Sequence, residues 1–313
     1  MSSSATEINH TDRASSWLVR VVRGLGQLPL WVLHGAGACL GRLAWLGSSG
    51  MRAKTRNNLQ TAGLYRPGLA WESAAAAGRA ALESAFVWFR PNHDLMAYCD
   101  REAATRLARE VLERQAAGDG RGLVLLTPHL GCFEMGARAY GATAPITVLY
   151  KAPRNPAAHH LLKVARNQAG VTPVPADTGG VRALLRALKR GEAVGILPDQ
   201  VPSAGDGEWA DFFGRPAFTM TLPMRLAEKT GARVCLLAVW RRPGGRGWDV
   251  EIEDIDELPT PQVLNARIEA LIRRHPEQYV WNYNRYKVPA GTMPPGPASA
   301  APDAPPTGEE GKS

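Results

Sequence analysis

The segment LTPHLGCFEMG combines a histidine and a glutamate that together could move a proton. His129 follows a short apolar run that predicts a buried strand, and Glu134 lies five positions later. On one helix, five residues would turn the two side chains about 140° apart, so they can meet only across an irregular turn. Pro128 and Gly131 predict such a turn. A histidine held by a carboxylate is a general base that can take the proton of an attacking hydroxyl.

Polar residues also follow two other predicted strands. The stretch PITVLYKAPRNP places Tyr150, Lys151 and Arg154 at the end of one strand, and AVGILPDQ places Asp199 and Gln200 at the end of another. In open α/β sheets, ligands bind beyond the carboxyl ends of the strands. We therefore expect one crevice that accepts an anionic ligand beside an acid–base pair. The His-x4-Glu spacing alone would favour a histidine that is merely hydrogen-bonded at a helix cap, and the two further strand ends change that balance.

Three neighbouring features leave alternatives open. Arg166, on the helix after the YKAPRNP turn, could form an ion pair or bind a substrate phosphate, or it could be a solvated helix charge. Cys132 could be a nucleophile beside His129, although a small buried packing residue is the simpler interpretation. The adjacent His159 and His160 do not have ligand spacing for one metal ion.

The run DFFGRPAFT, in a long connection after the strand that ends in AVGILPDQ, contains Phe212, Phe213 and Phe218. Connections of this length often carry function. The run could form an apolar wall for a ligand, although aromatic residues at this density more often belong to an ordinary core. Its place in a long connection favours a functional loop.

Apolar β-rich runs alternate with helical runs through most of the chain. The predicted strands cover residues 121–129, 145–151, 193–200 and 233–240, and the predicted helices cover 51–64, 69–90, 101–120, 133–140, 159–170, 181–192 and 221–231. Strands separated by helices predict βαβ units, and therefore an α/β fold with a mostly parallel sheet flanked by helices. The glycine-rich turn in WRRPGGRGWDVEIEDI predicts an antiparallel hairpin at the sheet edge.

The two ends of the chain differ from this α/β region, residues 51–288. Residues 17–50 predict a membrane-associating helical segment, because Leu28 to Leu46 is almost wholly apolar. His34 and Arg42 interrupt the run, so an interfacial helix fits better than a spanning one. A cleaved signal peptide is the alternative. Residues 1–16 and the Pro/Ala/Gly-rich residues 289–313 are predicted to be disordered.

Composition narrows the choice of partners. The net charge of +8 favours anionic partners, but the lysines and arginines are dispersed and form no basic-aromatic module, which argues against nucleic acid. The four cysteines have neither zinc-site spacing nor the density of a disulfide scaffold. A reducing, cytoplasmic environment is therefore expected.

The ordered set HLGCFE, YKAPRNP, GILPDQ and FFGRPAFT resembles blocks of the late (secondary) lipid A biosynthesis acyltransferases, the lauroyl/myristoyl transferase family of the glycerolipid acyltransferase superfamily. The similarity extends from about Trp17 to Lys287 and includes an early signature at Arg56, Asn58 and Leu59. The C-terminal block HPEQYVWNYNRYK departs from the family pattern, which has a histidine-arginine-arginine run where this chain has YNR. A role assigned to that histidine does not transfer.

The resemblance implies a glycerolipid acyltransferase-like fold and transfer of a fatty acyl group from acyl carrier protein to the hydroxyl of a 3-hydroxyacyl chain on a lipid A precursor. It implies His129 as the base, Glu134 as the group that orients and stabilises its imidazolium, and Arg166 and Asp199 as the residues that complete the site. No metal or organic cofactor is expected. The implied location is the cytoplasmic face of the bacterial inner membrane. The alternatives are acylation of another membrane glycolipid or amino-acid lipid, and a non-enzymatic basic membrane adaptor.

Overall fold

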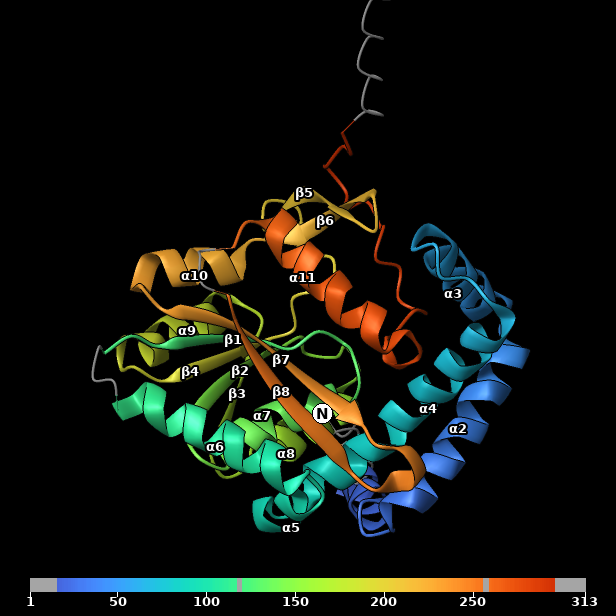
Figure 1. The fold of residues 1–313 in the computed structure, drawn as a ribbon, viewed down its shortest axis with the longest axis horizontal. Coiled ribbons are helices and arrows are strands. Elements are labelled where there is room, and N and C mark those ends of the chain that lie inside the picture. The colour runs from blue at the N-terminus through green and yellow to red at the C-terminus, as the bar shows by residue number, and fades with distance from the viewer. Residues whose placement is uncertain (1–15, 117–119, 256–258, 296–313) are drawn as a thin grey trace, which may run out of the picture.

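The computed structural model describes residues 16–116, 120–255 and 259–295 and shows an α/β fold around one central sheet (Figure 1). Of the segments predicted to be disordered, 1–16 and 289–313, residues 1–15 and 296–313 lie outside the described residues. The sheet has the order β3-β2-β4-β1-β7-β8. All neighbours in it are parallel except β7 and β8, which form the predicted antiparallel hairpin at one edge.

The strands are β1 (Leu123–Leu126), β2 (Ile146–Tyr150), β3 (Val171–Pro175), β4 (Ala193–Ile196), β5 (Gly207–Phe212), β6 (Arg215–Met220), β7 (Arg233–Arg241) and β8 (Trp248–Ile255). The helices are α2 (Leu30–Gly47), α3 (Ser49–Thr61), α4 (Pro67–Phe89), α5 (Asn92–Ala97), α6 (Arg101–Ala116), α7 (Phe133–Gly141), α8 (Pro156–Arg166), α9 (Thr178–Lys189), α10 (Leu222–Thr230) and α11 (Pro261–Arg274), with the short 3₁₀ helices η1 (Pro243–Gly245) and η2 (Pro276–Gln278). A further helical segment covers residues 16–25.

Helices cover both faces of the sheet, as the apolar composition of the strands requires. Every residue of β1 is buried: Val124 and Leu126 face one core with α9, α10 and α11, while Leu123 and Leu125 face a second core with α6, α7 and the end of α4 (Figure 1). Alternation of side chains along a strand produces this division. The sheet is therefore the rigid layer from which the functional loops project.

Two elements differ from the sequence-based expectation. The chain between α8 and α9 forms the edge strand β3, whose sequence VTPVP contains two prolines. Proline cannot donate a ladder hydrogen bond and so obscures a strand, yet it is tolerated at a sheet edge. The predicted functional loop in DFFGRPAFT is instead a separate antiparallel hairpin of β5 and β6. Phe212, Phe213 and Phe218 are buried core residues of this hairpin. None of them lines a described cavity, so they do not form the predicted apolar wall.

Helices α2 and α4 run side by side and approach closely through glycines (Figure 1). A methyl group at Gly78 of α4 would lie 1.9 Å from the carbonyl oxygen of Gly37, and one at Gly41 of α2 would lie 2.1 Å from that of Ala74. Such distances exclude any side chain. The two helices therefore form one rigid antiparallel layer.

Replacing Gly78 with alanine should force α2 and α4 apart and lower the melting temperature. We expect a cost of about 1–3 kcal/mol from overpacking, which exceeds the roughly 0.5–1 kcal/mol that alanine gains over glycine inside a helix. Thermal unfolding in detergent measures the effect. Gly68→Ala is the matched control, because this α4 glycine has open space around it; an equal melting temperature for both variants would contradict the close approach.

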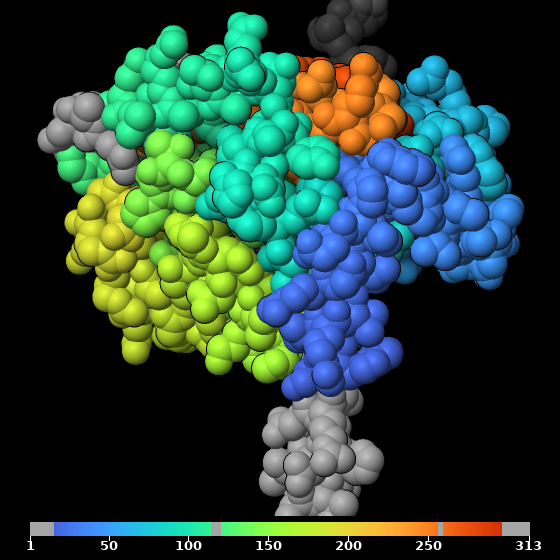
Figure 2. All heavy atoms as spheres, turned by 90° about the horizontal axis from the view of Figure 1, so that it is seen from below, coloured from blue at the N-terminus to red at the C-terminus, as the bar shows by residue number. Residues whose placement is uncertain are grey.

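The outer surface of the N-terminal segment is apolar. The large exposed side chains there are Trp17, Val21, Leu25, Leu28, Trp31, Leu40, Leu43 and Leu46, with exposed fractions from 37% to 65%. Figure 2 shows this segment on the outside of the molecule. Among the described residues, no helix has the length and hydropathy needed to cross a bilayer.

Candidate active site

His129 and Asp199 meet because they follow neighbouring strands at the same distance. Leu126, the last residue of β1, is the register partner of Ile196, the last residue of β4. His129 lies three residues beyond the first and Asp199 three residues beyond the second. The two parallel strands therefore deliver both side chains to one point beyond the carboxyl edge of the sheet.

The Asp199 carboxylate holds His129 through two hydrogen bonds. One oxygen lies 2.7 Å from Nδ1 of the imidazole, and the other accepts the backbone N–H of His129 at 2.9 Å. Burial alone would raise the pKa of Asp199, but the charge of His129 and these hydrogen bonds hold that pKa below its ordinary value. An ionised carboxylate can only accept, so in the neutral imidazole Nδ1 carries the proton and Nε2 presents its lone pair.

The free edge of the imidazole faces a polar cavity of about 190 Å³. The cavity is lined by His129, Asp199, Gln200, Tyr279, Val280, Asn282 and Tyr283. The side-chain amide nitrogen of Gln200 lies 3.1 Å from Nε2 of the histidine, where it can donate to the lone pair. A ligand hydroxyl that replaced this amide would therefore meet a ready base.

Two tyrosines, Tyr279 and Tyr283, line the cavity together with the histidine. Burial, followed by the negative charge of Asp199, raises the pKa of Tyr279 well above its ordinary value, so this hydroxyl stays protonated and can donate to the carboxylate. The hydroxyl of Tyr283 accepts the backbone N–H of Val201 at 2.9 Å. Tyr283 thus fixes the strand-to-loop segment that carries Asp199 and Gln200.

The structure corrects the role predicted for Glu134. Its carboxylate accepts hydrogen bonds from Arg166, at 3.2 Å from Nε and closer from Nη2, and from the Trp88 indole at 2.9 Å. Asp199, and not Glu134, holds the imidazole of His129. The helix explains the difference, because Glu134 in the first turn of α7 points toward α4 and α8. Arg166 forms an ion pair with Glu134, which is one of the roles that the sequence left open for it.

A second, largely apolar cavity has this ion pair in its lining, together with residues of α7, α8 and the sheet. Its lining includes Phe133, Ile146, Val148, Ala165, Gly195 and Leu197 together with Glu134 and Arg166. The ring of Phe133 packs against His129 with centroids 4.8 Å apart. Phe133 therefore forms the wall between the apolar cavity and the base.

The β2–α8 turn contributes fewer residues to the candidate site than the sequence predicted. Tyr150 is buried, and its hydroxyl lies 3.2 Å from Nε2 of His159, so it supports α8. Lys151 and Arg154 project into solvent from the turn. Among the described residues, neither lines the two cavities nor has a hydrogen bond or ion pair.

Cys132 is packed inside the protein and is poorly suited to nucleophilic chemistry. Burial, followed by the charge of Glu83, raises the pKa of the thiol well above its ordinary value. The side chain is 1% exposed and belongs to the core under α7. No group of three potential metal-binding His, Cys, Asp or Glu side chains occurs in the part of the chain that the structure describes.

The C-terminal segment lines the polar cavity, although its sequence alone assigned it no role here. The side-chain amide of Asn58 in α3 donates to the carbonyls of Trp281 and Tyr283 at 2.7 Å. The buried Arg285 is held by the carbonyl of Phe218 and by the Thr219 hydroxyl. The Asn58 contacts join residues more than 200 positions apart in the sequence, so only the two resembling blocks that contain those residues pointed to the segment.

Comparisons with known proteins agree with this arrangement. The model of the bacterial lipid A biosynthesis acyltransferase family matches residues 1–288. The chain is 27% identical over 284 residues to the lipid A biosynthesis palmitoleoyltransferase of Escherichia coli strain K12, which covers 84% of this chain and 90% of that protein. It is 26% identical over 298 residues to the lipid A biosynthesis lauroyltransferase of the same organism, which covers 90% of this chain and 94% of that protein. On the extent of the family match, this chain belongs to the bacterial lipid A biosynthesis acyltransferases.

Proposed function

We propose that this O-acyltransferase moves a fatty acyl group from an acyl carrier protein thioester to a hydroxyl of a 3-hydroxyacyl chain on the lipid A precursor. The observation that carries the proposal is the His129 imidazole, which Asp199 holds by Nδ1 while Nε2 faces a polar cavity. This is the geometry of a general base with a fixed tautomer. Family membership supports the lipid A precursor as acceptor.

The proposed reaction needs only groups present on this chain. Nε2 of His129 takes the proton of the acceptor hydroxyl as that oxygen attacks the thioester carbonyl. The acceptor displaces the Gln200 amide, whose freed N–H can then stabilise the developing oxyanion. As the tetrahedral intermediate collapses, the C–S bond breaks, the ester forms, and the leaving thiolate takes the proton from the imidazolium. Asp199 stabilises that imidazolium throughout.

We place the transferred acyl chain in the apolar cavity whose lining includes Glu134 and Arg166. Its walls are mainly aliphatic and aromatic side chains, whereas most side chains around the cavity at Nε2 carry a polar group, which suits the separate needs of an acyl chain and a hydroxyl. The enclosed space is about 50 Å³, so the α8 side chains must separate from the sheet when a chain enters.

We also propose that the protein works at the cytoplasmic face of the inner membrane. The exposed apolar side chains between Trp17 and Leu46 can enter one leaflet. The net charge of +8 favours both an acidic carrier protein and a phosphorylated lipid. A basic membrane adaptor without catalysis would share these surface features, but it would not need a buried His–Asp pair facing a cavity.

Filling the apolar cavity should shorten the accepted acyl chain. A methyl group at Gly195 would lie 2.9 Å from Val148 and 3.3 Å from Ile146, both of which line the cavity. For Gly195→Ala we expect kcat/KM for the longest accepted thioester to fall about tenfold, with shorter thioesters nearly unaffected. Competition between thioesters of mixed length, read by product mass, measures the shift. Gly50→Ala, at an open α3 position, should keep the wild-type length profile, and an unchanged profile in Gly195→Ala would remove the acyl chain from this cavity.

The proposed function is tested with the purified full-length protein in detergent. It is incubated with a tetra-acylated lipid A precursor and either acyl carrier protein thioesters or coenzyme A thioesters, and the lipid product is weighed by mass spectrometry. We expect the added mass of one acyl group with the carrier-protein donor. If a different glycolipid or an amino-acid lipid, offered in parallel, were acylated in preference, that lipid would be the acceptor. No added mass with any donor and acceptor would refute the assignment as an acyltransferase.

A further inference from the structure

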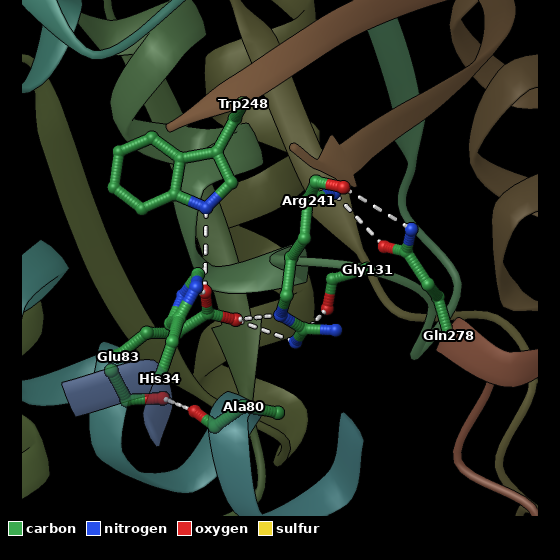
Figure 3. Close-up of polar contacts among 8 residues, drawn as sticks. His34, Ala80, Glu83, Gly131, Arg241, Trp248 and Gln278 are labelled. Atoms are coloured by element: carbon green, nitrogen blue, oxygen red, sulfur yellow. Dashed lines mark hydrogen bonds and ion pairs between the residues drawn. The ribbon is translucent and has the colours of Figure 1, made fainter. Parts of the chain in front are cut away.

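Figure 3 shows a buried charge cluster formed by Glu83, Arg241, His34 and Trp248. None of these side chains lines either cavity of the active site. At its centre, Glu83 of α4 is 1% exposed. One carboxylate oxygen accepts from the Arg241 side chain at the end of β7, 2.6 Å from Nε. The other lies 2.9 Å from Nε2 of His34 in α2 and accepts the Trp248 indole N–H at 3.3 Å. The cluster joins the α2–α4 layer to the sheet.

The cluster contains a persistent ion pair. Burial alone would raise the pKa of Glu83, but the Arg241 charge and the hydrogen bonds from His34 and Arg241 lower that pKa to about 2. Glu83 is therefore charged at every pH at which the protein would work. A buried pair of this kind often adds little to net stability, so its position is better explained by what Arg241 contacts next.

Arg241 contacts the turn that carries the catalytic histidine. Its Nη2 donates to the carbonyl of Gly131, two residues after His129 (Figure 3). The N–H of Gly131 donates to the carbonyl of Gln278 at 3.0 Å. The Gln278 side chain in turn accepts the backbone N–H of Arg241 at 2.9 Å and donates to its carbonyl at 3.3 Å. The N–H and the carbonyl of Gly131 are thus both held, by hydrogen bonds from two residues that also bond to each other, Arg241 and Gln278.

This turn has a conformation that favours glycine, and neighbouring segments pack closely against it. Gly131 has φ of +58°, which disfavours any side chain, and a methyl group there would lie 1.9 Å from the carbonyl oxygen of Val239. The carbonyl of His129 accepts the N–H of Val280 at 3.1 Å. The end of β7 and the C-terminal segment therefore grip the turn between His129 and Gly131.

We propose that Arg241 is a positioning residue for acyl transfer, fixed by Glu83 and acting through the carbonyl of Gly131 on the placement of His129. The inference rests on the proposed function, because it assigns Arg241 a part in that reaction. It also gives α2 a link to the active site, since His34 shares the carboxylate that fixes Arg241. A loss of this hold should lower the rate of the chemical step and leave substrate binding nearly unchanged.

The principal test variant is Arg241→Lys. Lysine keeps a positive charge beside Glu83, but one ammonium group cannot reproduce the planar fork that reaches both the carboxylate and the Gly131 carbonyl. We expect kcat to fall at least about tenfold, with KM within about twofold and little change in melting temperature. Arg42→Lys is the matched control, because Arg42 pairs with Glu72 across the same two helices at 2.6 Å and has no contact with the turn among its described interactions.

A second variant guards against misfolding. Glu83→Gln combined with Arg241→Met removes both charges together and leaves an amide to pair with His34 and Trp248, so the fold should be retained. We again expect reduced kcat in a protein that unfolds cooperatively. Wild-type kcat in this variant and in Arg241→Lys, with both folded, would overturn the proposal.

Amide hydrogen exchange gives a measurement that does not depend on catalysis. The amides of Gly131 and Cys132 should exchange at least about tenfold faster in Arg241→Lys than in wild type, and at the wild-type rate in Arg42→Lys. Unchanged exchange in Arg241→Lys would contradict the hold on the turn. If Arg241→Lys exchanged faster but the wild-type protein transferred no acyl group, the contact of Arg241 with the turn would be supported and the proposed function would be refuted.

Discussion

Replacing His129 with glutamine should reduce kcat for acyl transfer by about 10²–10⁴-fold, the usual contribution of a general base. Glutamine is close in size and can still donate to Asp199, so the fold and the shape of the cavity should persist. The substitution removes the Nε2 lone pair that faces the polar cavity. Steady-state transfer rates, together with melting temperatures, separate this effect from unfolding.

The control for this variant is His160→Gln. His160 is exposed on α8 and lines neither described cavity. Its replacement should leave kcat within about twofold of wild type, as is usual for surface substitutions. If His129→Gln retained the wild-type rate, the base would have to be another group and the proposed mechanism would fail.

Replacing Asp199 with asparagine should have an effect of similar size, about 10²-fold or more in kcat. The side chain keeps its shape, but the amide would donate to Nδ1 and thereby force the ring proton onto Nε2, where no base then remains. KM should change little, because the carboxylate is buried behind the imidazole. Product formation under saturating donor and acceptor measures the loss.

Two comparisons make this prediction specific. Asp211→Asn removes an exposed carboxylate on β5 and should leave the rate unchanged. Glu134→Gln should act differently from Asp199→Asn, since Glu134 pairs with Arg166 in the lining of the apolar cavity. A larger loss of kcat in Glu134→Gln than in Asp199→Asn would restore the carboxylate of α7 as the partner of the histidine.

The sequence predicted the strands that carry the site but not their order. The apolar runs before His129 and Asp199 identified β1 and β4, and the structure makes them neighbours. Periodicity describes each strand alone, whereas the pairing of strands depends on long-range packing. The equal spacing of both residues from paired strand ends becomes meaningful only when that pairing is known. The nearer carboxylate in sequence, Glu134, was therefore assigned the role that Asp199 occupies.

Other differences have local causes. The run from Gly207 to Met220 combines glycine, proline and closely spaced phenylalanines, which favoured a loop, yet β5 and β6 pair around Phe213, whose φ is +51°. In α7, the predicted turn and helix are confirmed, but the direction of the Glu134 side chain depends on Trp88 and Arg166 from other elements. Side-chain direction at a helix start is set by such tertiary partners.

The N-terminal segment illustrates what composition can predict. Its polar interruptions favoured a helix that does not span a membrane, and no described helix meets the length and hydropathy for spanning. The sequence did not predict that His34 of this segment would share a buried carboxylate with Arg241. A histidine within an apolar run has no sequence signal for a partner that lies 49 residues away in α4.

The most direct test of the central claim is a single-turnover measurement. Enzyme in excess over a labelled acyl carrier protein thioester is mixed with the lipid A precursor, and the label appearing in the lipid is followed for wild type and His129→Gln. Wild type should transfer the label to the lipid, and His129→Gln should do so at least about a hundredfold more slowly. Equal transfer rates in the two proteins would contradict catalysis through His129.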